Sequence, residues 1–140
     1  MAMLRSTPDL ARAVQHLRED HEAFEHRFDD LCARARTDDW RYLDEVWDAF
    51  VDDIDDHFAF EEEVLFPVLA EKGPDDRVLV ERLLAQHTEV RGTLQQLGVQ
   101  IQLHEIRAET IDRLVTLLRE HAALERERLY SWAEPTQRAS

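Results

Sequence analysis

Residues 57–67 of the chain, HFAFEEEVLFP, contain a histidine and a glutamate at helical spacing, and this pair indicates the fold. His57 precedes Glu61 by four residues, so on a helix the two side chains lie one turn apart on the same face. The pattern returns near the C-terminus in HAALERERLY, residues 121–130, as His121 and Glu125. The stretch therefore predicts a helix that presents an imidazole and a carboxylate to one side, and its second copy indicates an internal repeat.

A lone histidine precedes each copy at nearly the same distance. His21 lies 36 residues before His57, and His87 lies 34 residues before His121. The chain thus consists of two similar halves, each with one histidine followed by a His-x-x-x-Glu pair. Together the halves supply four imidazoles and two carboxylates, which is a suitable donor set for two metal ions.

The composition favours a single all-α domain in a reducing compartment. The chain has 140 residues, enough for one domain with a real core, and only 3 glycines and 4 prolines to form turns. A net charge of −14 argues against nucleic acid and anionic membrane surfaces as partners. No apolar run is long enough to span a membrane, and no signal peptide opens the chain. The single cysteine, Cys32, excludes an internal disulfide, so we expect a soluble cytoplasmic protein.

Apolar residues at helical spacing predict four amphipathic helices. Thr7-Pro8-Asp9 begins the first, 37–39 separates it from the second, and 72–75 forms the next loop. Pro67 should kink the second helix. Gly98 could end the third helix, but the repeat places the turn near His104, with the fourth helix starting at roughly residue 110. Short connections predict an antiparallel up-down-up-down four-helix bundle over 8–134, with an N-terminal arm, 1–7, and a tail, 135–140.

The spacing also predicts that the histidines meet. At about 1.5 Å rise per residue, all four fall at a similar height in the bundle, each on the apolar side of its helix. The candidate metal ligands are His21, His57, Glu61, His87, His121 and Glu125. Carboxylates from the second and fourth helices could bridge two ions, and mixed nitrogen and oxygen ligands favour iron over manganese or zinc. The alternative is a polar network buried in the core without metal.

These motifs resemble the hemerythrin-like, cation-binding HHE family. The resemblance rests on Asp20-His21-Glu22, on His57 to Pro67, on Gln86-His87 and on His121-x-x-x-Glu125, and it spans about residues 10–132. It implies a four-helix bundle that holds an oxo- or hydroxo-bridged di-iron centre and reacts with dioxygen, peroxide or nitric oxide. It also implies that His21 and His57 bind one iron, that His87 and His121 bind the other, and that Glu61 and Glu125 bridge them.

The chain departs from the oxygen carriers of that family in two places. Those proteins carry a second histidine four residues after the third-helix histidine, where this chain has Arg91. They also end on a histidine and an aspartate five residues later, where this chain has His121 and Glu125. One histidine fewer leaves exchangeable positions on both irons, which favours reaction or sensing over oxygen transport. The alternatives are a catalase- or peroxidase-like enzyme, an iron-binding or storage module without catalysis, and an interaction protein with a degenerate site; a homodimer is left open.

Several neighbouring residues receive alternative interpretations. Glu25, four residues after His21, is interpreted as an ion-pair partner of Arg91, as a third carboxylate ligand, or as a solvated side chain. Asp53, one turn before His57, either orients or replaces a ligand or belongs to a solvated acidic run. His16, His26 and His104 are expected to lie away from the site. Cys32 and five aromatic residues are interpreted as core packing, namely Phe28, Trp47, Phe50, Phe66 and Trp132.

Overall fold

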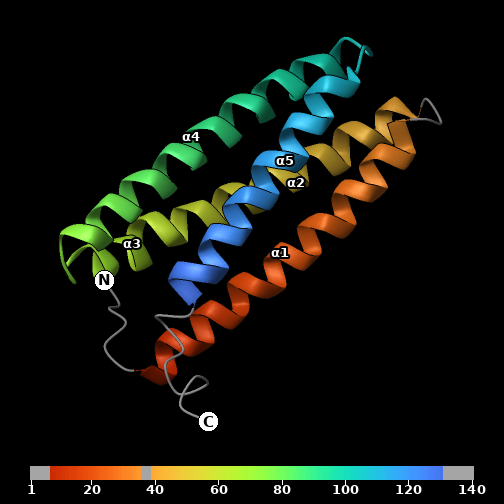
Figure 1. Ribbon diagram of the computed structural model, residues 1–140. Coiled ribbons are helices and arrows are strands. Elements are labelled where there is room, and N and C mark those ends of the chain that lie inside the picture. Colours follow the sequence, from red (N-terminus) through yellow and green to blue (C-terminus); the bar gives the residue numbers. More distant parts are fainter. Residues whose placement is uncertain (1–6, 36–38, 131–140) are drawn as a thin grey trace.

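The computed structural model describes residues 7–35 and 39–130. Its long helices run antiparallel to one another and form a bundle (Figure 1). This confirms the predicted four-helix architecture. The elements are α1 (Thr7–Ala35), α2 (Trp40–Phe60), η1 (Glu61–Leu65), α3 (Phe66–Ala70), α4 (Pro74–Gln102), α5 (Ala108–Leu124) and η2 (Glu125–Tyr130), where η denotes a π-helical turn.

The helix boundaries follow the local signals in the sequence. Asp39 caps α2 by accepting a hydrogen bond from the backbone N–H of Tyr42 at 3.4 Å, and Pro74 occupies the first turn of α4. The turn predicted near His104 is confirmed, since α4 ends at Gln102 and His104 has a φ of 57°. Gly98 lies inside α4, where a Cβ atom would come within 3.2 Å of Trp47 Nε1. Glycine is therefore used for close packing between α2 and α4.

The second and fourth helical rods each contain a π-helical turn. η1 and α3 continue α2, so this rod is interrupted by a π-helical turn just before Pro67. Pro67 follows in the first turn of α3, close to where a kink was expected. η2 continues α5 in the same way. Both turns begin at a candidate ligand, at Glu61 and at Glu125.

The core consists of two apolar clusters with a polar layer between them. One cluster lies toward the α1–α2 and α4–α5 connections and includes Phe50 and Ile54, both 0% exposed. The other lies toward the opposite end and includes Leu65 and Leu83, also 0% exposed. Leu84, which follows the fully buried Leu83, is 38% exposed at the edge of this cluster. The buried polar layer consists of His57, Glu61, His87, His121 and Glu125.

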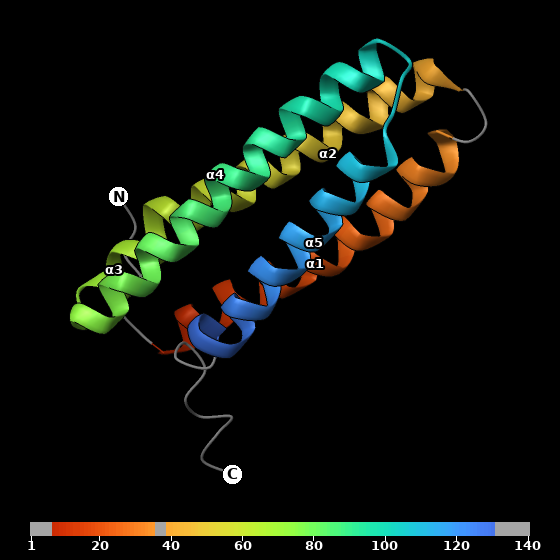
Figure 2. The ribbon, with the colours of Figure 1, turned by 45° about the horizontal axis from the view of Figure 1, so that its top comes forward.

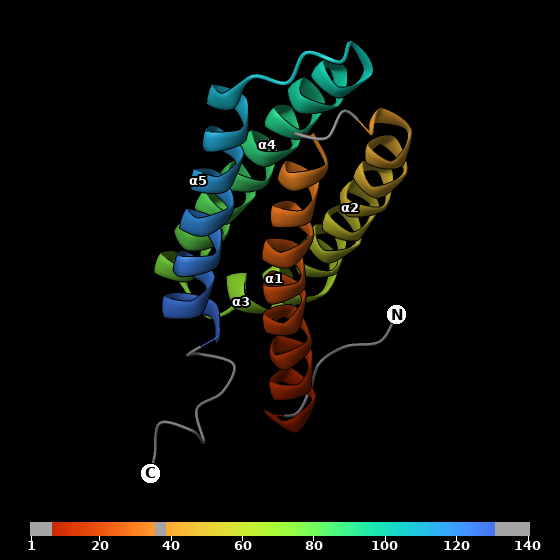
Figure 3. The ribbon, with the colours of Figure 1, turned by 90° about the vertical axis from the view of Figure 1, so that its right-hand side faces the viewer.

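Helix pairing differs around the bundle. α1 packs most extensively on α2 and α5 on α4, while α2 and α4 join the two pairs. Figures 2 and 3 show these helices from two further directions. Among the described residues, none of the helices combines the length and apolar character that a bilayer crossing requires.

Candidate metal centre

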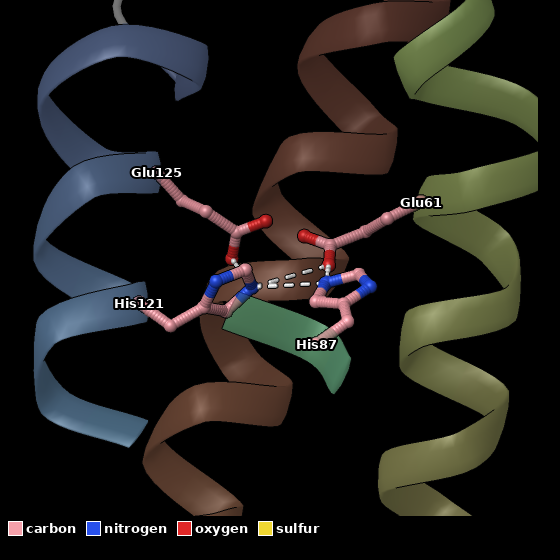
Figure 4. A group of neighbouring side chains, drawn as sticks. All are labelled: Glu61, His87, His121 and Glu125. Atoms are coloured by element: carbon pink, nitrogen blue, oxygen red, sulfur yellow. Dashed lines mark hydrogen bonds and ion pairs between the residues drawn. The ribbon is translucent and has the colours of Figure 1, made fainter. Parts of the chain in front are cut away.

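The structure brings all six candidate ligands together at one level of the bundle, five of them buried and His21 partly exposed. His21 comes from α1, His57 from α2, His87 from α4 and His121 from α5, while Glu61 and Glu125 begin η1 and η2. Figure 4 shows four of them, with Glu61 and Glu125 facing each other above His87 and His121. One donor atom from each of these four lies within 4.8 Å of the others, and the same holds for His21, His57 and Glu125. This buried cluster of histidines and glutamates is able to bind metal.

The histidines form two pairs through their Nε2 atoms. His21 Nε2 lies 3.2 Å from His57 Nε2, and His87 Nε2 lies 3.1 Å from His121 Nε2. Each pair joins one histidine from a helix with one from the next helix in the chain. The four rings therefore meet in the two pairs that the family resemblance implies.

Each glutamate lies between the two histidine pairs. Glu61 Oε1 is 2.9 Å from His87 Nε2, and its Oε2 is 3.6 Å from His57 Nε2. Glu125 Oε1 is 3.2 Å from His21 Nε2 and 3.4 Å from His121 Nε2. Glu61 Oε1 is also 3.5 Å from His121 Nε2. Both carboxylates thus contact at least one imidazole of each pair. Both glutamates are 0% exposed.

The π-helical turns help to position these carboxylates. The N–H of Phe66 bonds to the carbonyl of Glu61, five residues earlier, instead of to a carbonyl four residues earlier. Such a turn inserts one residue into the helical register and is frequent at functional sites. Both turns start four residues after a candidate histidine, at Glu61 after His57 and at Glu125 after His121. The local backbone therefore repeats along with the motif.

Acceptors on neighbouring helices hold the imidazoles of His57, His87 and His121 through Nδ1. His57 Nδ1 is 3.0 Å from Asp20 Oδ2, and His87 Nδ1 is 2.6 Å from Glu62 Oε2. The third contact joins His121 Nδ1 and Gln86 Oε1 at 2.7 Å. An imidazole that donates from Nδ1 presents Nε2 as a metal ligand, and such outer contacts fix the ring orientation.

These acceptors were not predicted, although a signal was present. Asp20 and Gln86 each precede a candidate ligand, and Glu62 follows one. A side chain next to a ligand on one helix reaches the histidine of the following helix. The adjacency was visible in the sequence, but the direction in which each side chain points was not.

Burial and charge shift the protonation equilibria of the cluster. Burial, together with the neighbouring His57, lowers the pKa of His21 to about 4. Burial also lowers the pKa of His121. For Glu61, burial acts in the opposite direction, but hydrogen bonds with His121 and His87 lower the pKa to about 2. The centre therefore combines an anionic glutamate with imidazoles that resist protonation.

This arrangement fits a bound cation. Of the described side chains, none donates a hydrogen bond to Glu61 Oε2, which is buried. A buried anionic oxygen without a donor is costly unless positive charge lies close to it. His57 Nε2 and Glu61 Oε2 converge on one side, while His87 Nε2, His121 Nε2 and Glu61 Oε1 converge on the other. A metal ion on each side would take these lone pairs.

The hypotheses about the neighbouring residues are partly wrong. Arg91 does not pair with Glu25: it donates from Nη1 to Glu62 Oε2 at 2.9 Å. Glu25 instead lies on the surface, 71% exposed and 4.0 Å from Arg119, as the solvated alternative has it, and it is in neither group of side chains that could hold a metal. Asp53 pairs with Arg27. Asp53 is also absent from the groups of described side chains that could hold a metal.

The remaining histidines and the core residues lie largely as expected. His26 and His104 are exposed, and His104 stacks on Trp40 with ring centroids 4.4 Å apart. Cys32 packs against the apolar core, and Phe28, Trp47, Phe50 and Phe66 are buried. The side chain of His16 and the whole of Trp132 lie outside the described part of the chain.

The fold and the buried cluster together define a helical-bundle, cation-binding class of protein. The sequence profile described as "Hemerythrin HHE cation binding domain" matches residues 12–133. Because this match covers most of the chain, the protein belongs to the hemerythrin HHE cation-binding family. No curated protein and no solved structure matches the chain in the corresponding comparisons.

Proposed function

We propose that this protein holds two iron ions and reacts with dioxygen or peroxide. His21 and His57 would bind one ion, His87 and His121 the other, and Glu61 and Glu125 would bridge them. The observation that carries the proposal is the position of the two glutamates, each in contact with at least one histidine of each pair. A polar network without metal would not require this arrangement.

The donor set supports iron and an open coordination shell. Imidazole nitrogen and carboxylate oxygen suit iron, which favours octahedral coordination. Two imidazoles and two carboxylate oxygens leave part of that shell to a small molecule. Iron in this position would supply the electrons for reaction with dioxygen or peroxide.

The chain's own residues shield the centre on most sides. The Phe58 ring stacks on His87 at a centroid distance of 3.7 Å, and Phe24 meets His57 edge-on at 5.4 Å. Three site histidines are at most 3% exposed, whereas the side chain of His21 is 20% exposed. A small reactant would therefore reach the centre beside His21.

Metal content and peroxide turnover test the proposal together. Protein produced in iron-rich medium should carry two irons per chain and show oxo-bridged di-iron absorption bands. His57→Ala and His121→Ala should lower the iron content and abolish oxygen evolution from hydrogen peroxide. His26→Ala, which changes an exposed histidine on α1, is the matched control. Absence of bound iron would overturn the di-iron assignment, and iron-loaded protein inert toward both oxidants would overturn the reactivity.

A second candidate is an iron-sensing or iron-binding module without turnover. It is favoured by the full burial of Glu61 and Glu125, because two buried carboxylates make the fold depend on bound cations. A large rise in thermal stability on iron loading, together with no reaction toward peroxide or dioxygen, would select this candidate.

A further inference from the structure

A cavity of about 770 Å³ opens between α1 and α5, beside the candidate metal centre. Three of the candidate ligands line it: His21, His57 and His121. α1 and α5 each pack mainly on another helix, which leaves room between them. The cavity therefore connects the surface with the side of the centre on which His21, His57 and His121 lie.

The cavity is much larger than the proposed reactants need. A water molecule occupies roughly 30 Å³ in the liquid, and dioxygen and peroxide are of comparable size. Pockets for organic ligands commonly measure about 300–1,000 Å³. A volume of about 770 Å³ lies well inside that range. The size points to an organic molecule as the occupant.

The wall is largely apolar, and aromatic rings form part of it. Phe24, Phe28 and Phe58 are buried side chains on this wall, and Leu118 and Ala122 on α5 are partly buried opposite them. Such a lining suits a flat hydrocarbon or aromatic body, because burying apolar surface supplies most of the binding energy.

The charged residues of the wall favour an anionic group on that body. Those from α1 are Arg18, Glu22, Glu25 and Asp29, and those from α5 and η2 are Arg119 and Arg126. Glu22, Glu25 and Asp29 are exposed, and Glu25 already pairs with Arg119. Arg18 is half-buried, whereas Arg126 is exposed but lies close enough to His21 to act on its charge. A cation therefore lies at the His21 side of the cavity, where the carboxylate of a ligand would meet it.

We propose that this cavity binds a small organic carboxylate whose apolar body packs on Phe24, Phe28 and Leu118 and whose carboxylate faces Arg126. The ligand would lie against the side of the centre that His21, His57 and His121 form. The inference depends on the cavity and not on the proposed reaction with dioxygen or peroxide.

Calorimetric titration of the full-length, iron-loaded protein tests this proposal with three matched probes. They are 2-naphthoate, 2-naphthylmethanol and 2-naphthylmethylamine, which share a body and differ in charge. We expect saturable 1:1 binding of the carboxylate, at least about fivefold weaker binding of the alcohol, and the weakest binding of the amine. Equal binding of all three, tighter binding of the amine, or no saturable binding of the carboxylate would overturn the proposal.

Variants locate the binding to the cavity. Ala122→Trp should fill it and weaken 2-naphthoate binding at least tenfold, and Arg126→Gln should weaken it about tenfold. Arg113→Gln is the matched control on α5, since Arg113 is 58% exposed and pairs with Glu89. Unchanged affinity in both cavity variants would overturn the proposal. If Ala122→Trp does not fold, Arg126→Gln decides. Iron content is measured separately, so failure of the di-iron assignment is distinguished from failure of ligand binding.

Discussion

Replacing Glu62 by glutamine tests whether the residues around the ligands control metal binding. Glu62 Oε2 accepts from His87 Nδ1 at 2.6 Å and from Arg91 Nη1 at 2.9 Å. Glutamine keeps the size and one acceptor oxygen but removes the negative charge. Hydrogen bonds to charged groups contribute about 1.5–3 kcal/mol each. Because the side chains of Glu62 and Arg91 are 27% and 39% exposed, solvent screens both bonds, and we expect a total loss of about 2 kcal/mol in unfolding free energy.

The effect on metal affinity should be larger and confined to one half of the centre. Loss of an outer partner of a metal-binding histidine typically lowers affinity about 10–100-fold. Competition with a chelator should therefore remove the ion at His87 and His121 at lower chelator concentration than in the wild type. The ion at His21 and His57 should be retained longer.

Glu63→Gln is the matched control, because Glu63 is the next residue in the same π-helical turn and is exposed. Glu63→Gln changes the net charge of the protein by the same amount as Glu62→Gln without touching a histidine. Equal chelator resistance of Glu62→Gln and the wild type would refute the role assigned to Glu62. Equal weakening by both substitutions would instead trace the effect to net charge.

Three further outcomes are expected. Removing iron should lower the melting temperature on the order of 10 °C, because binding at 1,000-fold excess over Kd stabilises the folded state by about 4 kcal/mol; calorimetry with and without chelator measures this. In the metal-free protein, the pKa of His21 is about 4 when folded and 6.5 when unfolded. Between pH 4 and pH 6.5, His21 is therefore protonated in the unfolded state and neutral in the folded state. Urea unfolding should show full His21-linked stability above pH 6.5 and a loss of at most about 3 kcal/mol as the pH falls to 4. Phe50→Ala should cost about 3–5 kcal/mol in the same assay, since Phe50 is 0% exposed.

Helical periodicity predicted the fold and the meeting of the site residues because both depend on short-range spacing. Because the rise per residue of an α-helix hardly varies, two residues that lie equally many positions from a turn on neighbouring helices lie at the same height in the bundle. His21, His57, His87 and His121 were expected at one level, and their Nε2 atoms lie in two close pairs. The repeat also decided where the third turn lies, against the competing signal of Gly98.

The pairing of Arg91 with Glu25 was wrong because it was argued from position in the repeat and not from facing surfaces. The two residues are equivalent in the repeat, but equivalent positions lie on diagonally opposed helices with the core between them. Arg91 on α4 instead faces η1, where Glu62 lies, and Glu25 on α1 faces Arg119 of α5. A long side chain at the edge of a helix selects its partner by rotamer and helix rotation, which spacing alone does not specify.

The two halves of the chain repeat the candidate ligands but not the residues around them, and this difference makes the two sides of the centre unequal. Glu62 follows Glu61 and accepts from His87, whereas Arg126 follows Glu125 and acts on His21 as a positive charge. Arginine has no acceptor with which to hold an imidazole Nδ1. The residue after the glutamate therefore holds an imidazole ring in the first half of the chain, as Glu62, and carries a positive charge at the cavity wall in the second half, as Arg126. His21 is also the most exposed of the four site histidines, so small molecules should approach the proposed di-iron centre from its side, while His87, which is 0% exposed, stays closed off.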